Sequence, residues 1–275
     1  MRVVFCLAAC ACILAVVLIC VFLFANGLPF FSKVNALDFL MGQKWKPGND
    51  IYGILPMILG SIYITAGAVL LGAPIAVFTA LYMAYFAPRS VLRLLQPAVS
   101  LLAGIPSVIY GLFGLTVLVP FVRETFGGKG LSILTASMLL ALMILPTVIQ
   151  VAVSSLRQVP RSYYEGSLAL GATPERSVFR VMLPAARSGV ASGIVLGVGR
   201  AIGETTAVMM VAGSQPRMPA GLLKGVRTLT VNIVMEMGYA AELHRDALIA
   251  TGVVLFIFIL LINLLFSLMK RRQSA

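Results

Sequence analysis

The sequence predicts an all-α, polytopic membrane protein with about six transmembrane helices. Its 275 residues are 60% hydrophobic and only 11% charged, whereas soluble domains carry about 25% charged residues. Predominantly apolar runs, each long enough to cross a hydrocarbon core of about 30 Å, lie near 3–25, 55–86, 92–121, 131–153, 188–212 and 247–269. Barrel strands would alternate apolar and polar residues over about ten positions, so these long runs are interpreted as helices.

The first apolar run is expected to be a retained transmembrane helix within residues 1–27, rather than a signal peptide. It is longer than the core of a signal peptide, and no A-x-A-like cleavage site precedes Asn26. The same run contains all the cysteines of the chain, which are Cys6, Cys10, Cys12 and Cys20. A disulfide framework spreads its cysteines across loops, so these thiols are expected to face lipid as small apolar groups. With His244 as the single histidine, no metal site is expected.

The rest of the chain is expected to comprise an extracytoplasmic loop (28–54), a core of five transmembrane helices (55–269) and a basic tail (270–275). Lys and Arg are slightly more frequent on the side of both termini, so both termini are predicted to be cytoplasmic. The net charge of +12 does not indicate nucleic-acid binding, because the basic residues are scattered between apolar runs. In a second outer loop, 213–246, the stretch VNIVMEMGYAAELHRDAL is predicted to lie along the membrane interface, either in a docking role or as a simple connecting helix.

The loop between the fourth and fifth runs, within residues 158–187, carries the start and stop signals of a helical hairpin. These signals are Ser162 with Glu165 as a capping box, Gly171 as a left-handed C-cap, Thr173 with Pro174 as an N-cap and first helical residue, and Pro184 before the fifth run. The spacing predicts one helix that begins at Tyr163 and a second that runs toward Met182. Such a hairpin suits insertion into the groove of a partner through its apolar residues, Leu168, Leu170, Val178 and Phe179. The alternative is a surface loop that merely connects two spans.

The fifth run places a charged residue, Arg200, near the middle of a predicted span. A charge at that depth costs at least about 2.5–3.5 kcal/mol. The GxxxGxxxG pattern that ends at Gly197 allows another helix to approach closely, so Arg200 is expected to face the bundle. Glu204 follows four residues later and is predicted to pair with it. Two interpretations remain open: a buried pair that fixes packing, or a guanidinium that binds an oxyanion in a polar path, with Thr205 and Thr206 adding hydroxyl groups.

Residues 104–114, GIPSVIYGLFG, predict a locally broken helix. Broken helices at membrane depth usually line cavities, so Pro106, Ser107 and Tyr110 are candidate gate residues. Ordinary kinked packing is the alternative.

The hairpin is similar to the EAA loop of ABC importer permeases. That pattern has Glu-Ala-Ala, a Gly four residues after the second Ala, and Ile-x-Leu-Pro after nine more. This chain has Glu165-Gly166-Ser167, Gly171 and Val181-Met182-Leu183-Pro184, so it departs at Gly166, Ser167 and Val181. The resemblance implies a type I ABC importer permease-like fold whose cytoplasmic coupling loop enters a cleft of an ATPase. The residues implied to couple are Glu165, Ser167, Leu168, Gly171, Thr173, Leu183 and Pro184.

Three further stretches, IPSVIYGLFGL, GRAIGETTAV and RTLTVNIVMEMGYA, resemble the phosphate-specific permeases of the PstC type over roughly residues 55–269. The resemblance implies a subunit in the bacterial inner membrane that imports inorganic phosphate, with Arg200 and Glu204 important for transport. It also implies a sister permease (PstA-like), a cytoplasmic ATPase dimer (PstB-like) and an extracytoplasmic phosphate-binding protein (PstS-like). No cofactor is expected on this chain, because ATP would be used by the partner subunits.

Other functions are weighed against this one. A PstA-type sister subunit and a permease for another oxyanion share most of the motifs. A secondary transporter driven by an ion gradient often shows internal repeats, and none is found. An enzyme is disfavoured, because the sequence contains no GxxxxGK[ST] phosphate loop and one histidine.

Overall fold

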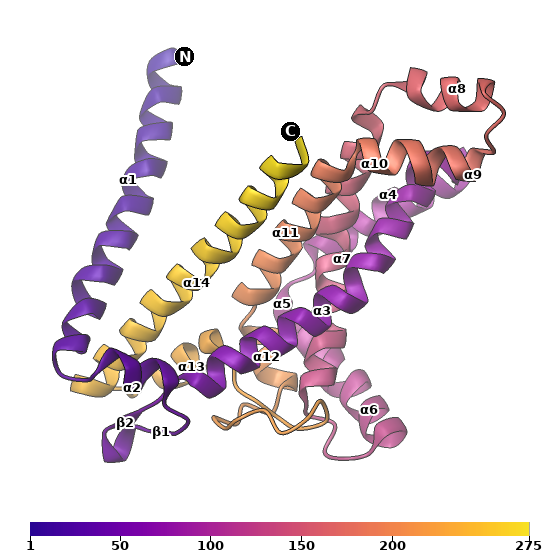
Figure 1. The fold of residues 1–275 in the computed structure, drawn as a ribbon. Coiled ribbons are helices and arrows are strands. Elements are labelled where there is room, and N and C mark those ends of the chain that lie inside the picture. Colours follow the sequence, from indigo (N-terminus) through magenta and orange to yellow (C-terminus); the bar gives the residue numbers. More distant parts are fainter. Residues whose placement is uncertain (275) are drawn as a thin grey trace.

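The computed structural model describes residues 1–274, with side chains described through Leu265. The side chains of the basic tail predicted at 270–275 therefore lie outside the described residues. Within the described chain, five helices are long and apolar enough to cross a membrane, and one bent helix pair brings the number to six. The prediction of an all-α protein with about six transmembrane helices is confirmed (Figure 1).

The elements follow one another in a single order along the chain. They are α1 (Arg2–Gly27), η1 (Leu28–Ser32), α2 (Ala36–Met41), β1 (Trp45–Lys46), η2 (Pro47–Asn49), β2 (Ile51–Tyr52), α3 (Leu55–Leu81), η3 (Tyr82–Phe86), α4 (Arg89–Gly104), α5 (Ser107–Phe113), η4 (Gly114–Leu118), α6 (Val119–Phe126), α7 (Ile133–Gln158), α8 (Arg161–Ala169), α9 (Pro174–Ser177), η5 (Val178–Met182), α10 (Leu183–Ala185), α11 (Arg187–Gly203), α12 (Thr206–Val211), α13 (Leu229–Glu236) and α14 (Glu242–Ser274). The elements η1 and η2 are 3₁₀-helices, and η3, η4 and η5 are π-helical turns.

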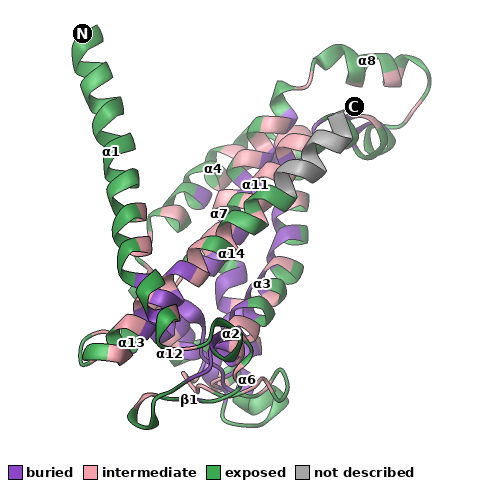
Figure 2. Cartoon of the chain, turned by 60° about the vertical axis from the view of Figure 1, so that its left-hand side comes forward, coloured by how far each residue is buried: buried purple, intermediate pink, exposed green. Residues whose placement is uncertain are grey.

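The two ends of the bundle differ in character. The start of α1 lies at the same end as the α8–α9 hairpin, and α14 runs toward that end as well (Figure 1). The short sheet, α2 and α6 lie at the opposite end. Figure 2 shows that buried residues gather toward this opposite end, near α12 and α13, whereas α1 and the hairpin are mostly exposed.

α1 stands against the rest of the bundle only through its last turns. Phe24 meets Phe256 of α14 edge to face, with ring centroids 5.9 Å apart. Gly27 is the buried residue of α1, and a Cβ added there would lie 2.5 Å from a methyl group of Val253. The outward faces of this helix are apolar, as a lipid environment requires.

α3 and α7 form the central pair of the bundle. A Cβ added at Gly72 of α3 would lie 3.0 Å from the carbonyl oxygen of Ala141 in α7, so only a small residue permits this approach. Ser132 caps the start of α7 by accepting a hydrogen bond from the backbone of Thr135, as its position before an apolar run favours. The main buried cluster surrounds this pair and includes Ile64, Ala68, Leu139, Leu140 and Met143.

Two of the apolar runs are broken rather than continuous; the break in 92–121 confirms the broken helix predicted at 104–114, whereas the break in 188–212 corrects the expected continuous helix. Residues 92–121 contain an interruption at Ile105 and Pro106, whose ψ angles of 126° and 143° are extended. Proline lacks an N–H and disfavours the helical conformation of the residue before it. The run 188–212 is interrupted as well, because α11 ends at Gly203 and α12 begins at Thr206.

The helix within residues 213–246 is α13, and it connects elements inside the fold. Leu229 and Val231 are buried, and Asn232 is fully enclosed. α13 thus packs among its neighbours in the fold, and its position at the membrane interface and its docking role stay predictions.

Candidate functional site

The hairpin begins two residues earlier than the sequence pattern predicts. α7 ends at Gln158 and α8 begins at Arg161, with Pro160 in the N-cap position. The predicted capping box of Ser162 and Glu165 is therefore wrong. The backbone N–H of Tyr163 donates to the carbonyl oxygen of Pro160 at 3.1 Å, so the first turn already includes Ser162.

The turn of the hairpin follows the predicted chemistry. Gly171 has a φ of +84°, which is the left-handed conformation that glycine adopts without strain. Its N–H donates to Leu168 at 2.9 Å. The Thr173 hydroxyl oxygen then accepts from the N–H of Arg176 at 3.3 Å, and Pro174 occupies the first turn of α9. The Gly171 C-cap and the Thr173 N-cap are confirmed.

The hairpin exposes apolar side chains at its tip and anchors itself at its base. None of the residues of α8 is buried, and Leu170 is 91% exposed. Phe179 is exposed, but Val178 is fully buried, so the prediction that Val178 helps insertion into a partner is wrong. Tyr164 stacks on Tyr85 with ring centroids 5.9 Å apart, which holds α8 against the bundle.

The predicted coupling residues are spread over both faces of the hairpin. The exposed ones are Glu165, Gly171, Thr173 and Pro184, and the half-buried ones are Ser167, Leu168 and Leu183. The Ser167 hydroxyl donates to the carbonyl oxygen of Tyr164 within α8. Beyond Pro184 the chain bends by 71° between the segment Pro174–Ala185 and α11. Along the chain, the hairpin thus leads directly into α11, the helix that carries Arg200.

Arg200 lies in the last turn of α11 and faces α7. Its guanidinium donates to the Thr147 hydroxyl oxygen at 3.1 Å. A Cβ added at Gly197 would lie 2.9 Å from a methyl group of Val148, so the glycine pattern does bring α11 onto α7. Arg200 is half-buried and faces the bundle, as its sequence context predicted.

Glu204 does not pair with Arg200, which corrects the prediction. The helix ends at Gly203, and Glu204 has extended backbone angles of −71° and 122°. A spacing of four residues brings two side chains together only while the helix continues. The Glu204 carboxylate instead accepts from the N–H of Ala207 at 3.1 Å and caps α12. Among the described residues, no carboxylate forms an ion pair with Arg200.

The hydroxyl groups beside this break also take local roles. Thr205 donates to the carbonyl oxygen of Gly203 at 3.3 Å. Thr206 is the first residue of α12, and both threonine side chains are half-buried. Arg200, Glu204 and the two threonines thus lie within seven residues around the break, without an ion pair between Arg200 and Glu204.

The second break holds the candidate gate residues. Pro106 and Ser107 start α5, and the Tyr110 hydroxyl reaches back across the break to donate to the carbonyl oxygen of Leu102 at 2.9 Å. Tyr110 is buried. A hollow of about 560 Å³ lies beside the break, between Pro97 and Pro106.

The two breaks belong to helices that pack on one another. A Cβ added at Gly114, just after α5, would lie 2.8 Å from a methyl group of Val211 in α12. A Cβ at Gly111 would collide with the side chain of Met210. The glycines that weaken the helix at 104–114 therefore also provide the contact surface for the element that follows Glu204.

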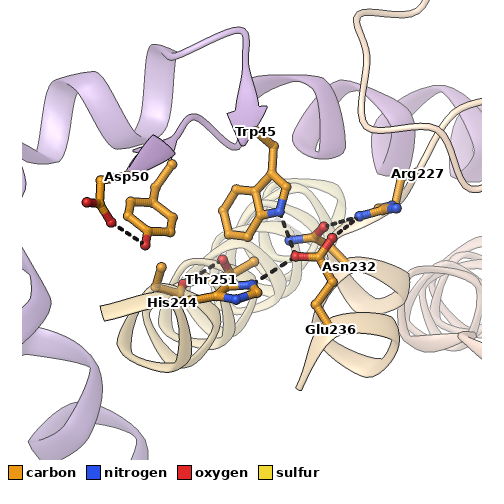
Figure 3. A network of polar contacts seen from close by, with 9 residues as sticks. Trp45, Asp50, Arg227, Asn232, Glu236, His244 and Thr251 are labelled. Carbon is orange, nitrogen blue, oxygen red and sulfur yellow. Dashed lines mark hydrogen bonds and ion pairs between the residues drawn. The ribbon is translucent and has the colours of Figure 1, made fainter. Parts of the chain in front are cut away.

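A buried polar network at the opposite end of the bundle escaped the sequence analysis (Figure 3). The Glu236 carboxylate accepts hydrogen bonds from the Trp45 indole at 2.8 Å and from the Arg227 guanidinium, and it contacts the His244 ring at 2.9 Å. Asn232 accepts a further bond from Arg227 at 3.0 Å. The network joins the 28–54 loop, the 213–228 loop, α13 and α14. The available signal was an Arg and a Glu in an otherwise apolar RTLTVNIVME stretch.

A second polar pair borders this network. The Tyr52 hydroxyl donates to the Asp50 carboxylate at 3.1 Å. Burial, followed by this hydrogen bond and the carboxylate charge, raises the pKa of Tyr52 to about 12. Tyr52 therefore stays neutral at physiological pH and serves as a packing group against Trp45.

These features define the class of protein. A bundle of about six spans, with broken helices at mid-depth and an exposed hairpin at one end, is the fold of type I ABC importer permeases. The structure matches a chain of an inward-facing MetNI methionine ABC transporter with a TM-score of 0.67, at 19% identity, over 84% of this chain and 100% of that chain. It matches a chain of a bacterial alginate ABC transporter with the same TM-score of 0.67, at 16% identity, over 97% of this chain and 94% of that chain.

The chain belongs to the family described as binding-protein-dependent transport system inner membrane component, whose model matches residues 72–275. It is 39% identical to the probable ABC transporter permease protein YqgH of Bacillus subtilis, over 95% of this chain and 89% of the relative. It is 33% identical to the phosphate transport system permease protein PstC of Mesorhizobium japonicum, over 96% of this chain and 88% of the relative. The chain is therefore an ABC importer permease subunit of the inner membrane. Permeases of this class are not enzymes themselves, and they work with a second permease, an ATPase and a binding protein.

Proposed function

We propose that this chain is the PstC-type permease subunit of an ATP-driven importer for inorganic phosphate. The observation that carries the proposal is the position of Arg200, half-buried at a helix break and bonded to Thr147. A charged group inside a spanning bundle is costly and usually functional. A guanidinium offers planar pairs of donors that suit an oxyanion, and no described carboxylate pairs with this one. The relatives named PstC support phosphate as the oxyanion.

In this proposal, the substrate path runs past the two helix breaks. Arg200 binds the anion, and the hydroxyl groups of Thr205 and Thr206 lie beside it. Glu204 shapes the path by capping α12 rather than by neutralising Arg200. Pro106, Ser107 and Tyr110 form the gate, because the break that they build packs on α12 through its glycines.

The coupling proposal rests on the hairpin and its connection to α11. Both chain termini and the hairpin are cytoplasmic, and the 158–187 loop docks on a PstB-like ATPase dimer. The exposed tip at Gly171 and Leu170 supports docking. A PstA-like sister permease completes the pathway, and a PstS-like protein delivers phosphate from the other side. ATP is used by the partners, and this chain holds no cofactor or nucleotide site of its own.

A permease for another oxyanion is the second candidate. The relative from Bacillus subtilis carries no substrate in its name, and a guanidinium also suits sulfate or phosphonate. A PstA-type role is a related alternative, because the two sister permeases share the motifs around both breaks.

Reconstituted uptake tests the proposal. The complete importer is purified through a tag on this chain and reconstituted into vesicles, with ATP on the side of the ATPase subunits. Labelled inorganic phosphate is supplied with the binding protein on the other side. Phosphate uptake that depends on ATP and resists an excess of sulfate is expected. Uptake of sulfate in preference to phosphate would favour the second candidate. Phosphate uptake that follows a proton gradient without ATP would contradict both.

A further inference from the structure

The bundle surface carries a groove whose lining is unusual for a membrane protein. It has a volume of about 570 Å³ and lies between η3, α4 and α7. Its lining residues, which define the polar groove, are Met83, Gln96, Val99, Ser100, Ile149, Gln150, Val153, Ser154, Arg157 and Gln158. Most of these side chains are polar, although the groove lies among helices that cross the membrane.

A stripe of polar residues runs along α7, and its part from Gln150 to Arg157 lines the polar groove. Thr147, Gln150, Ser154 and Arg157 follow one another at intervals of three and four residues, which places them on one helix face. The stripe begins at Arg200, because Thr147 accepts the hydrogen bond of that guanidinium. At a rise of about 1.5 Å per residue, it extends about 15 Å toward the hairpin end of α7.

The exposure of these residues is the reverse of what lipid would favour. Gln150 and Ser154 are exposed, whereas the apolar residues Val148, Ala152 and Leu156 of the same helix are buried. An exposed amide or hydroxyl in hydrocarbon lacks the water that satisfies it. Gln158 donates to the Ser154 hydroxyl at 3.4 Å, but Gln150 has no side-chain hydrogen bond among the described residues. This face therefore suits water or a polar partner better than lipid.

The polar groove connects the features already described. Ser100 of α4 lines both the groove and the hollow beside the Pro106 break. Arg157 lines both the groove and a cavity of about 680 Å³ beneath α8, which also contains Arg161. The groove thus runs from the hollow beside the Pro106 break to a cavity beside the hairpin that Arg157, Arg161 and Glu165 line. Two arginines and one glutamate give this mouth a net positive charge, which attracts anions.

We propose that the polar groove is the hydrated exit limb of the substrate path, which carries inorganic phosphate from Arg200 to the hairpin end. Gln150 and Ser154 contact the anion in transit, and Arg157 draws it toward the mouth. This inference rests on the proposed function, because it takes the passage of an oxyanion as given.

Cysteine labelling tests the groove without measuring transport. The native Cys6, Cys10, Cys12 and Cys20 are first replaced by Ala, which is mild because they lie on α1. Gln150→Cys and Ser154→Cys are then introduced into the complete reconstituted importer. Ile75→Cys is the control, because Ile75 is 56% exposed on α3 and its neighbour Ala76 packs in one buried cluster with Val148 and Ile149, next to Gln150. The labelling reagent is a methanethiosulfonate that carries a negatively charged sulfonate group.

The two groove thiols are expected to react about 100-fold faster than the control, because the reactive thiolate forms only in water. Inorganic phosphate is expected to slow their labelling, and Arg157→Gln is expected to slow it several-fold for the anionic reagent but not for a cationic one. Labelling of the groove thiols as slow as that of Ile75→Cys overturns the inference. A groove filled by lipid or by a partner helix would give this result. Fast labelling whose rate is unchanged by phosphate and by Arg157→Gln also overturns the inference. Failure of the proposed function would show separately, as unaltered phosphate uptake by an Arg200→Ala variant.

Discussion

Arg200 and Gly171 show how single residues set the properties of this chain. Arg200 is held by one hydrogen bond to Thr147 and by a glycine face that brings α11 onto α7. The packing of α11 on α7, and not a carboxylate, orients the other N–H donors of the guanidinium. At Gly171 the backbone conformation determines which residue fits, because a φ of +84° excludes most side chains whatever the space around it.

Gly171→Val is expected to distort the hairpin and weaken its hold on the ATPase. No atom lies within 4 Å of a Cβ added there, so the effect arises from backbone strain of about 1–2 kcal/mol rather than from a clash. Co-purification of the ATPase with the tagged chain measures the effect, and a several-fold loss is expected. Gly171→Asn is the matched control, because Asn tolerates the left-handed conformation. Equal losses for the two variants would contradict this account.

At the scale of elements, the molecule joins separate segments through breaks and buried polar groups. The breaks at 105–106 and 204–205 are brought together because α5 and η4 pack on α12. At the other end, Glu236 of α13 joins Trp45 from the outer loop, Arg227 from the 213–228 loop and His244 from α14. One carboxylate therefore joins three neighbouring segments near the end of the chain to the outer loop that carries Trp45, 191 residues away in the sequence.

Glu236→Leu is expected to destabilise this end by about 3–5 kcal/mol, because it leaves the buried Arg227 charge without a partner. The double variant Glu236→Leu with Arg227→Leu is expected to be more stable than Glu236→Leu alone, since it removes both charges. Trp45 is the only tryptophan of the chain and donates to Glu236, so its fluorescence reports the melting of this network directly. Additive losses in the double variant would show that the pair is not coupled.

At the scale of the whole molecule, the hairpin and the mid-bundle arginine belong to one continuous segment. The chain passes from α8 through the Gly171 turn and the 71° bend into α11, which carries Arg200. In the proposed function, movement of the hairpin by the ATPase reaches the substrate path along this segment. Buried Val178 and the Tyr85–Tyr164 stack anchor the base of the hairpin to the bundle. Movement of the hairpin would therefore be passed to the bundle, which a loose loop would not do.

Features with a local cause could be predicted from the sequence. The apolar runs follow from the bilayer thickness, and the Gly171 and Thr173 caps follow from short-range backbone chemistry. Features that depend on distant partners could not. The pairing of Arg200 with Glu204 assumed a continuous helix, and the Glu236 network requires four segments to meet. Val178 looked like a docking residue only because the sequence does not show which face of the hairpin meets the bundle.

Phosphate uptake by an Arg200→Ala variant of the reconstituted importer tests the central claim most directly. Loss of a charge-assisted hydrogen bond worth about 1.5–3 kcal/mol is expected to lower uptake about 10- to 100-fold. Assembly with the ATPase should be unchanged, because Arg200 lies far along α11 from the hairpin. Arg200→Lys should retain part of the rate, and Arg123→Ala, an exposed arginine of α6, should retain all of it. Uptake by Arg200→Ala at the wild-type rate would contradict the account.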